Sequence, residues 1–148
     1  AGLSTSILDG GRGFDDLVLS SSADGMSWSP ATRIPIVPRS SRSDLVIPGL
    51  AVDRSRTGRL AVAYYVFRSA ALLDVGFISS SNGGRSWSSS RRLNAQTMRL
   101  DWIAQAGGAM VGDYISTSFA GGRAVAAFPV ATARGTQFDQ PLFAAVIP

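Results

Sequence analysis

The chain has 148 residues with 14 basic and 10 acidic side chains, a net charge of +4, and 45% hydrophobic residues. Histidine and cysteine are absent, which excludes a Ser-His or Cys-His nucleophile, a disulfide and a thiolate zinc site within this chain. No apolar run approaches the roughly 18 residues of a membrane span. The basic residues are scattered, apart from Arg39/Arg42, Arg54/Arg56/Arg59 and Arg91/Arg92. No aromatic–basic ladder is present, which argues against nucleic-acid binding.

The charged residues are of two kinds only: every basic residue is Arg and every acidic residue is Asp. A compositional bias of the source explains this inventory. An Arg-bearing face that binds carboxylates or phosphates is the functional alternative, because guanidinium groups bind both in a bidentate manner.

The predicted elements are almost all strands. Short apolar runs rich in Val, Ile, Ala and aromatic residues alternate with Gly, Ser, Asp and Pro, a pattern that predicts an all-β fold. Residues 1–13 are Gly-rich and ambiguous, and no cofactor-binding phosphate loop is predicted there. Strands are expected at 16–20 and 28–36, followed by a crossing over 35–43.

One complete four-stranded module is predicted next. Its strands are expected at 50–52, 60–65, 75–79 and 87–93, with a turn over 54–58 and a connection over 67–72. Four antiparallel strands per module are typical of a β-propeller blade.

The C-terminal part is predicted to be an incomplete module. Strands are expected at 114–119, 124–130 and 142–147, with a turn at 120–123 joining the first two. Residues 94–105 are compatible with either a short helix or a long loop.

A short turn motif occurs twice, directly after predicted strands. The segments are Ser-Ser-Ala-Asp-Gly-Met-Ser-Trp and Ser-Ser-Asn-Gly-Gly-Arg-Ser-Trp, and their Trp residues are 59 positions apart. Glycines tolerate positive φ, Ser, Asp and Asn side chains bond nearby backbone amides, and the Trp rings are expected to be buried. The residues assigned these structural roles are Ser21, Asp24, Gly25 and Trp28 in the first copy, and Ser80, Asn82, Gly83, Gly84 and Trp87 in the second.

Both segments resemble the Asp box, or BNR repeat, of sialidase-like β-propellers. The segments 48–53 with 58–60, and 111–115 with 121–122, resemble the openings of blades in secreted bacterial members of that group. The resemblance implies about two and a half blades of a six-bladed ring: the end of one blade at 1–37, a complete blade at 48–93 and an incomplete last blade at 107–148. The remaining blades would come from the same longer chain, which the first residue Ala1 favours, or from a second copy.

The resemblance also implies where an active site would lie. Sialidases use a Tyr nucleophile paired with a Glu, an Asp as acid/base, and an Arg cluster that binds the sugar carboxylate. Tyr114 matches the nucleophile position, Asp113 is the candidate partner, and Arg68 and Arg134 are the candidate substrate-binding residues. The chain contains no Glu, and Asp113 and Tyr114 are adjacent, so on a strand their side chains would point to opposite faces.

Two functions therefore remain open. One is an exo-α-sialidase or related glycosidase, which releases terminal sugars from glycans. The other is a non-catalytic, secreted or cell-surface propeller that binds a glycan or a protein. No cofactor or metal site is predicted, although Asp9 or the pair Asp15/Asp16 leaves calcium open.

Overall fold

The computed structural model of the chain describes residues 2–9, 14–39, 41–69, 71–112, 114–133 and 135–148. No helix within these ranges is both long and apolar enough to cross a membrane. The described elements are β1 (Gly2–Asp9), β2 (Asp15–Ser22), β3 (Thr32–Arg33), β4 (Asp44–Val52), β5 (Leu60–Ser69), β6 (Leu72–Ser80), β7 (Arg91–Arg92), β8 (Met98–Arg99), the 3-10 turn η1 (Leu100–Trp102), β9 (Ser116–Ala120), β10 (Arg123–Pro129) and β11 (Leu142–Ile147).

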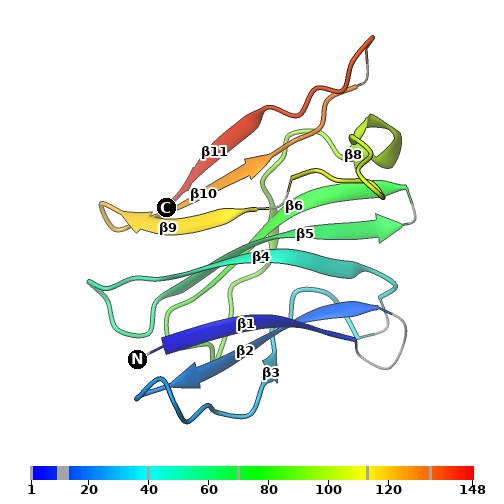
Figure 1. Cartoon of the computed structure of the whole chain (residues 1–148). Helices are drawn as coiled ribbons and strands as arrows, with labels where there is room; N and C mark the ends of the chain where they lie inside the picture. The colour runs from blue at the N-terminus through cyan, green and yellow to red at the C-terminus, as the bar shows by residue number, and fades with distance from the viewer. Residues whose placement is uncertain (1, 10–13, 40, 70, 113, 134) are drawn as a thin grey trace.

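The strands form three antiparallel sheets, which lie side by side in chain order (Figure 1). The first sheet has the order β1-β2-β3, and the second β4-β5-β6-β7, with β8 also paired to β6. The third has the order β9-β10-β11. The prediction of an all-β fold is confirmed.

The central strand of the middle sheet, β5, is buried on both faces. Leu60, Val62 and Tyr64 pack toward the first sheet, whereas Ala63 and Tyr65 pack toward the third. Since successive side chains of a strand point to opposite faces, a strand between two cores is apolar at every position. This explains the uninterrupted apolar run of 60–67.

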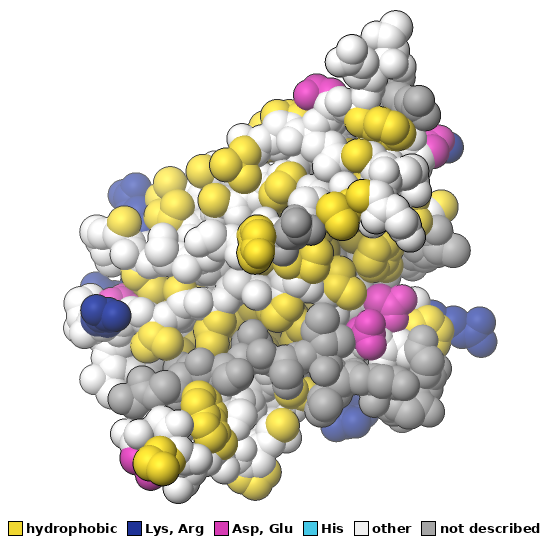
Figure 2. Space-filling model, viewed as in Figure 1, with side chains coloured by type: hydrophobic (Ala, Val, Ile, Leu, Met, Phe, Trp, Pro, Cys, Tyr) yellow, Lys and Arg dark blue, Asp and Glu magenta, His cyan; other side chains and the backbone are white. Residues whose placement is uncertain are grey.

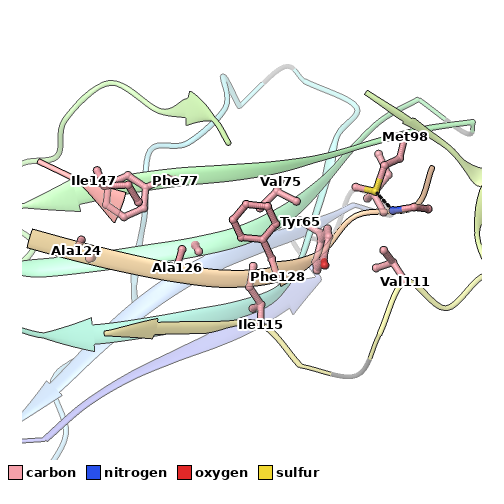
Figure 3. Close-up of a cluster of buried hydrophobic side chains, with 14 of the residues drawn as sticks. Tyr65, Val75, Phe77, Met98, Val111, Ile115, Ala124, Ala126, Phe128 and Ile147 are labelled. Carbon is pink, nitrogen blue, oxygen red and sulfur yellow. Dashed lines mark hydrogen bonds between the residues drawn. The ribbon is translucent and has the colours of Figure 1, made fainter. Parts of the chain in front are cut away.

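Two polar contacts accompany the hydrophobic core between the second and third sheets (Figure 3). The Tyr65 hydroxyl donates a hydrogen bond to the Pro129 carbonyl at 2.8 Å. The Ala131 backbone N–H lies 3.2 Å from the Met98 sulfur, the dashed line in Figure 3. Buried polar groups therefore have partners where the two sheets meet.

Two predicted boundaries differ because strands continue through β-bulges. The strand predicted at 50–52 begins at Asp44, and Ile47 has a φ of +50° where the pairing shifts register. The connection predicted at 67–72 contains the end of β5 and the start of β6. Arg68 lies where the pairing of these two strands shifts register. A bulge inserts an extra residue without ending the pairing.

The structure also refines four other segments of the chain. The fourth strands expected at 28–36 and 87–93 are paired at two residues each, in β3 and β7. Of the ambiguous segment 1–13, residues 2–9 form β1, and the segment 94–105 contains β8 and η1. The three strands expected after residue 107 are found at β9, β10 and β11.

The turns between strands gather at two opposite ends of the sheets. Because the strands are antiparallel, both Asp-box turns lie at the end that also holds the β4–β5 and β9–β10 turns. The other end is formed by the described residues of 38–43, 68–72, 94–115 and 130–141, at the right of Figure 1, and is called the loop rim below.

Candidate functional site

The two Asp-box turns are organised by one acceptor side chain each. The Asp24 carboxylate accepts the backbone N–H groups of Met26 and Ser27, both at 2.8 Å. These bonds lower the pKa of Asp24 to about 2, because they stabilise the charged form. In the second turn the Asn82 side-chain oxygen accepts the Ser86 N–H at 2.9 Å.

The first hydroxyl of the motif belongs to Ser22 and not to Ser21 as the sequence predicted. Ser22 is buried, accepts the Gly25 N–H at 2.7 Å and donates to Asp24, as Ser80 does with Gly84 and Asn82. Ser21 instead pairs with Ser29 through its backbone. From this serine to the motif Trp, the first copy is one residue shorter than the second. Aligning the two copies on their Trp residues therefore matched Ser80 with Ser21 and not with Ser22.

The two Trp residues of the motif have different environments. Trp87 packs against the core between the first two sheets, as predicted. Trp28 is 45% exposed, and the prediction that its ring is buried was wrong. Neither of the two buried clusters of described residues includes Trp28.

A second repeated feature was not predicted from the sequence. It is an Asp–Arg pair that joins the last strand to its sheet. Arg33 donates two hydrogen bonds to Asp16, at 2.7 and 2.8 Å, and one to the Val37 carbonyl. At the same place in the second sheet, Arg92 lies 3.9 Å from Asp74. In each copy the Arg follows the motif Trp by five residues, which was the available signal.

The candidate nucleophile Tyr114 lies on the loop rim, two residues before β9 begins at Ser116, and is 84% exposed. Asp113, its proposed partner, lies outside the described residues. No hydrogen bond from a described residue reaches the Tyr114 hydroxyl, so no described base activates it.

The candidate ligand residue Arg68 also lies on the loop rim, but its guanidinium is engaged. Its Nε donates to Asp74 at 2.6 Å, and Asn94 donates to the same carboxylate. Although burial alone would raise it, the pKa of Asp74 is lowered overall by hydrogen bonds from Asn94 and Arg68. No ion pair or hydrogen bond joins Arg68 to Tyr114, and Arg134 lies outside the described residues.

The loop rim contains a small, partly enclosed polar cavity of about 110 Å³ between β2, β3 and the loop that follows β3. Its charged lining is Asp16, Arg33 and Arg39. Arg33 donates two hydrogen bonds to Asp16, and Arg39 contributes a second guanidinium to the lining. The remaining lining residues are Phe14, Val37, Pro38, Ser41 and Ser43.

This lining suits a small anionic group. An Arg, two serine hydroxyls and an aromatic edge can bind a carboxylate and the adjacent hydroxyl-bearing carbons of a sugar. The sequence did not single out Arg39, since its neighbours in the cavity come from three separate segments.

Within the described residues, no three Asp, Glu, His or Cys side chains cluster as a metal site would require. Both carboxylate oxygens of Asp16 are bound by Arg33. The side chain of Asp9 lies outside the described part of the chain, so its suggested role in binding calcium stays a prediction.

Comparison of the chain with protein-family models, with curated proteins and with solved structures finds no match.

Proposed function

We propose that this chain is part of a sialidase-like β-propeller whose loop rim binds an acidic glycan. The observation that carries the proposal is the Arg39 cavity, which places the guanidinium of Arg39 beside Ser41, Ser43 and Phe14. A sugar carboxylate is the ligand group that this set recognises best. The protein would be secreted or at the cell surface, where such glycans occur.

The propeller part of the proposal rests on the repeated motif and on the exposed ends of the sheet stack. In both Asp-box turns an Asp or Asn side chain accepts a backbone N–H, and three antiparallel sheets follow one another along the chain. The outer face of the third sheet exposes Leu142 and Val146, at 72% and 59%. Further sheets, from the same longer chain or from a second copy, would cover this face and Trp28.

The experiment compares the affinities of the protein for sialyllactose and for lactose by isothermal titration calorimetry. We expect measurable binding of the sialylated sugar, and a loss of roughly tenfold or more in Arg39→Gln, because a charged hydrogen bond is removed. Arg42 is exposed and does not line the cavity, so Arg42→Gln is the matched control and should bind as the native protein does.

Equal affinities for the two sugars, or equal losses in the two Arg variants, would contradict the proposal. An unchanged melting temperature in both variants confirms that each is folded.

Hydrolysis is the second candidate, favoured by the exposure of Tyr114 on the same rim. A tyrosine nucleophile of a retaining glycosidase needs a base close to its hydroxyl, and no described residue provides one. If the parent protein is an exo-α-sialidase, Tyr114→Phe abolishes turnover of a fluorogenic sialoside and leaves sialyllactose binding intact. Retained turnover in that variant would exclude Tyr114 as the nucleophile.

A further inference from the structure

The two asparagines of the chain differ in the residue that follows them. Asn82 precedes Gly83, whereas Asn94 precedes Ala95. Because glycine has no Cβ, its backbone nitrogen approaches the preceding side chain with little steric hindrance. Asn-Gly is therefore the sequence at which a backbone nitrogen attacks an asparagine side chain most readily.

This attack leads to deamidation, whose bonds can be followed at Asn82. The Gly83 nitrogen loses its proton to solvent and bonds to the side-chain carbonyl carbon of Asn82, and the side-chain nitrogen leaves as ammonia. Water then opens the cyclic imide. Cleavage of the new bond gives aspartate, and cleavage of the original peptide bond gives isoaspartate, whose main chain runs through Cβ. The overall reaction consumes one water, releases one ammonia and needs no oxidant or cofactor.

The closed second Asp-box turn holds both reacting groups in other contacts. The Gly83 N–H donates a hydrogen bond to the Gly58 carbonyl at 2.7 Å. The Asn82 side-chain nitrogen donates to the Ser86 hydroxyl at 2.8 Å, and its oxygen accepts the Ser86 N–H at 2.9 Å. For the attack, the Gly83 nitrogen must leave Gly58 and the Asn82 side chain must rotate, so the closed turn opposes both motions.

The hydroxyl of Ser80 keeps this turn closed. Ser80 is 4% exposed, and its hydroxyl accepts the backbone N–H groups of Asn82 at 3.2 Å and Gly84 at 2.9 Å. The same hydroxyl donates to the Asn82 side-chain oxygen at 3.0 Å. Opening of the turn breaks these bonds, so the open turn is a minor state of the folded chain.

Arg side chains are present at the end of the sheets where this turn lies. Figure 2 shows them at the left of the molecule, the end opposite the loop rim. Arg54 and Arg56 belong to the turn that bonds Gly83, Arg85 belongs to the motif turn itself, and all three are exposed. Positive charge favours loss of the proton from the Gly83 nitrogen and the carboxylate of the product.

We propose that Asn82–Gly83 is a deamidation site that the closed turn protects, so that it reacts only while the turn is open. An aspartate product fits the closed turn, because the Ser86 N–H already points at this side chain, as two N–H groups do at Asp24. An isoaspartate product lengthens the main chain by one atom and moves the Gly83 N–H from the Gly58 carbonyl. The site is independent of glycan binding on the loop rim.

The test measures the rate of Asn82 loss by mass spectrometry of proteolytic fragments, at one mildly alkaline pH. The folded chain is compared with the same chain unfolded in guanidinium chloride. We expect the folded chain to react more slowly by roughly tenfold or more, because several hydrogen bonds must break before the attack.

Ser80→Ala should raise the rate in the folded chain roughly tenfold relative to its own unfolded rate, because three hydrogen bonds of the turn are lost. Ser81→Ala is the matched control. Ser81 is exposed in the same turn, and among the described residues its side chain makes no hydrogen bond with Asn82 or Gly83. This variant should react as the native chain does.

Hydrogen exchange tests the protection on the native chain, without a variant that could unfold. Exchange and deamidation both require the Gly83 N–H to leave the Gly58 carbonyl, so folding should slow deamidation by at least as much as it slows exchange of this amide. Equal deamidation rates in the folded and unfolded chains, equal effects of Ser80→Ala and Ser81→Ala, or deamidation slowed less than exchange would overturn the proposal. An Asn82 that survives unchanged in the unfolded chain would do so as well.

Discussion

The adjacent glycines of the second Asp-box turn show how local and tertiary constraints differ at a single residue. Gly83 and Gly84 both have positive φ, +74° and +87°, a region that L-residues with a Cβ disfavour. A Cβ on Gly83 would meet no atom within 4 Å, whereas a Cβ on Gly84 would overlap Leu19 of the first sheet.

We therefore expect unequal costs for two matched substitutions. Gly83→Ala should lower the free energy of unfolding by about 1–2 kcal/mol, the cost of the left-handed backbone. Gly84→Ala should cost roughly 1–3 kcal/mol more, because the neighbouring side chain must move within a packed core. Urea denaturation measures the free energy of unfolding of both variants. Equal costs would mean that the Leu19 side chain moves aside without loss of stability.

Asp24 predicts a pH dependence that its counterpart Asn82 lacks. The pKa of Asp24 is about 2 in the folded chain, below its ordinary value of 3.8. Its contribution to stability is therefore complete above the ordinary pKa and is lost as the pH falls toward 2.

Carbon-13 NMR titration of the Asp24 carboxyl group should give a midpoint near pH 2. In Asp24→Asn, the part of the acid destabilisation due to this residue should disappear. Asn82→Asp should create a second carboxyl group with a lowered pKa, because the Ser86 N–H already points at this position. A midpoint near 4 for Asp24 would show that the turn bonds are not maintained in solution.

At the scale of elements, each short last strand is joined to its sheet by an Arg–Asp contact in addition to its backbone hydrogen bonds. β3 pairs with β2 at two residues, and Arg33 adds a bidentate contact to Asp16 with 16% of its side chain exposed. Arg99 and Asp101 form a pair of similar length whose side chains are 60% and 62% exposed.

Arg33→Ala should lower the free energy of unfolding by about 1–3 kcal/mol, because it leaves a partly buried carboxylate without its partner. Arg99→Ala, the matched control, should leave the melting temperature unchanged within error, since solvent screens an exposed pair. Comparable losses in the two variants would show that burial does not set the strength of these pairs.

Tyr65 joins two elements of different sheets through its bond to the Pro129 carbonyl. Burial raises the pKa of Tyr65 well above its usual range, so the hydroxyl stays a donor at any pH at which the protein is folded. Tyr65→Phe should cost about 1–2 kcal/mol in chemical denaturation, because a partly buried carbonyl loses its partner. An unchanged stability would mean that water replaces the hydroxyl.

At the scale of the whole molecule, the middle sheet is the most protected part of the chain. Its two faces are covered by the first and third sheets, whereas those sheets are each covered on one side by described residues. Amides of β5 and β6 should therefore exchange hydrogen most slowly.

Hydrogen exchange followed by NMR should also show alternation along β11. Within the described residues β11 pairs with β10 alone, and the Val130 N–H donates to the Pro141 carbonyl. Since bonded and non-bonded pairs alternate along this ladder, the amides of Leu142, Ala144 and Val146 should exchange quickly and those of Phe143 and Ala145 slowly. Uniform protection along β11 would indicate that another strand already covers its edge.

The sequence determined those features that depend on neighbours within a few residues. The all-β pattern, the strand at 142–147 and the acceptor roles of Asp24 and Asn82 follow from local spacing, because a turn side chain bonds amides two to four residues away. The alternation of polar and apolar residues likewise identified most strands, although it could not show where a bulge lets a strand continue past Ile47 or Arg68.

Only the tertiary structure decided the features that depend on contacts between sheets. The same motif places Trp87 in a core and leaves Trp28 exposed, because burial of a ring is set by the sheet beside it and not by its own turn. For the same reason Arg68 is bound to Asp74, and Arg39 lines a cavity with residues of two other segments. Burial and charge pairing are properties of the packed molecule, so a single sequence indicates the turns more reliably than it indicates the site.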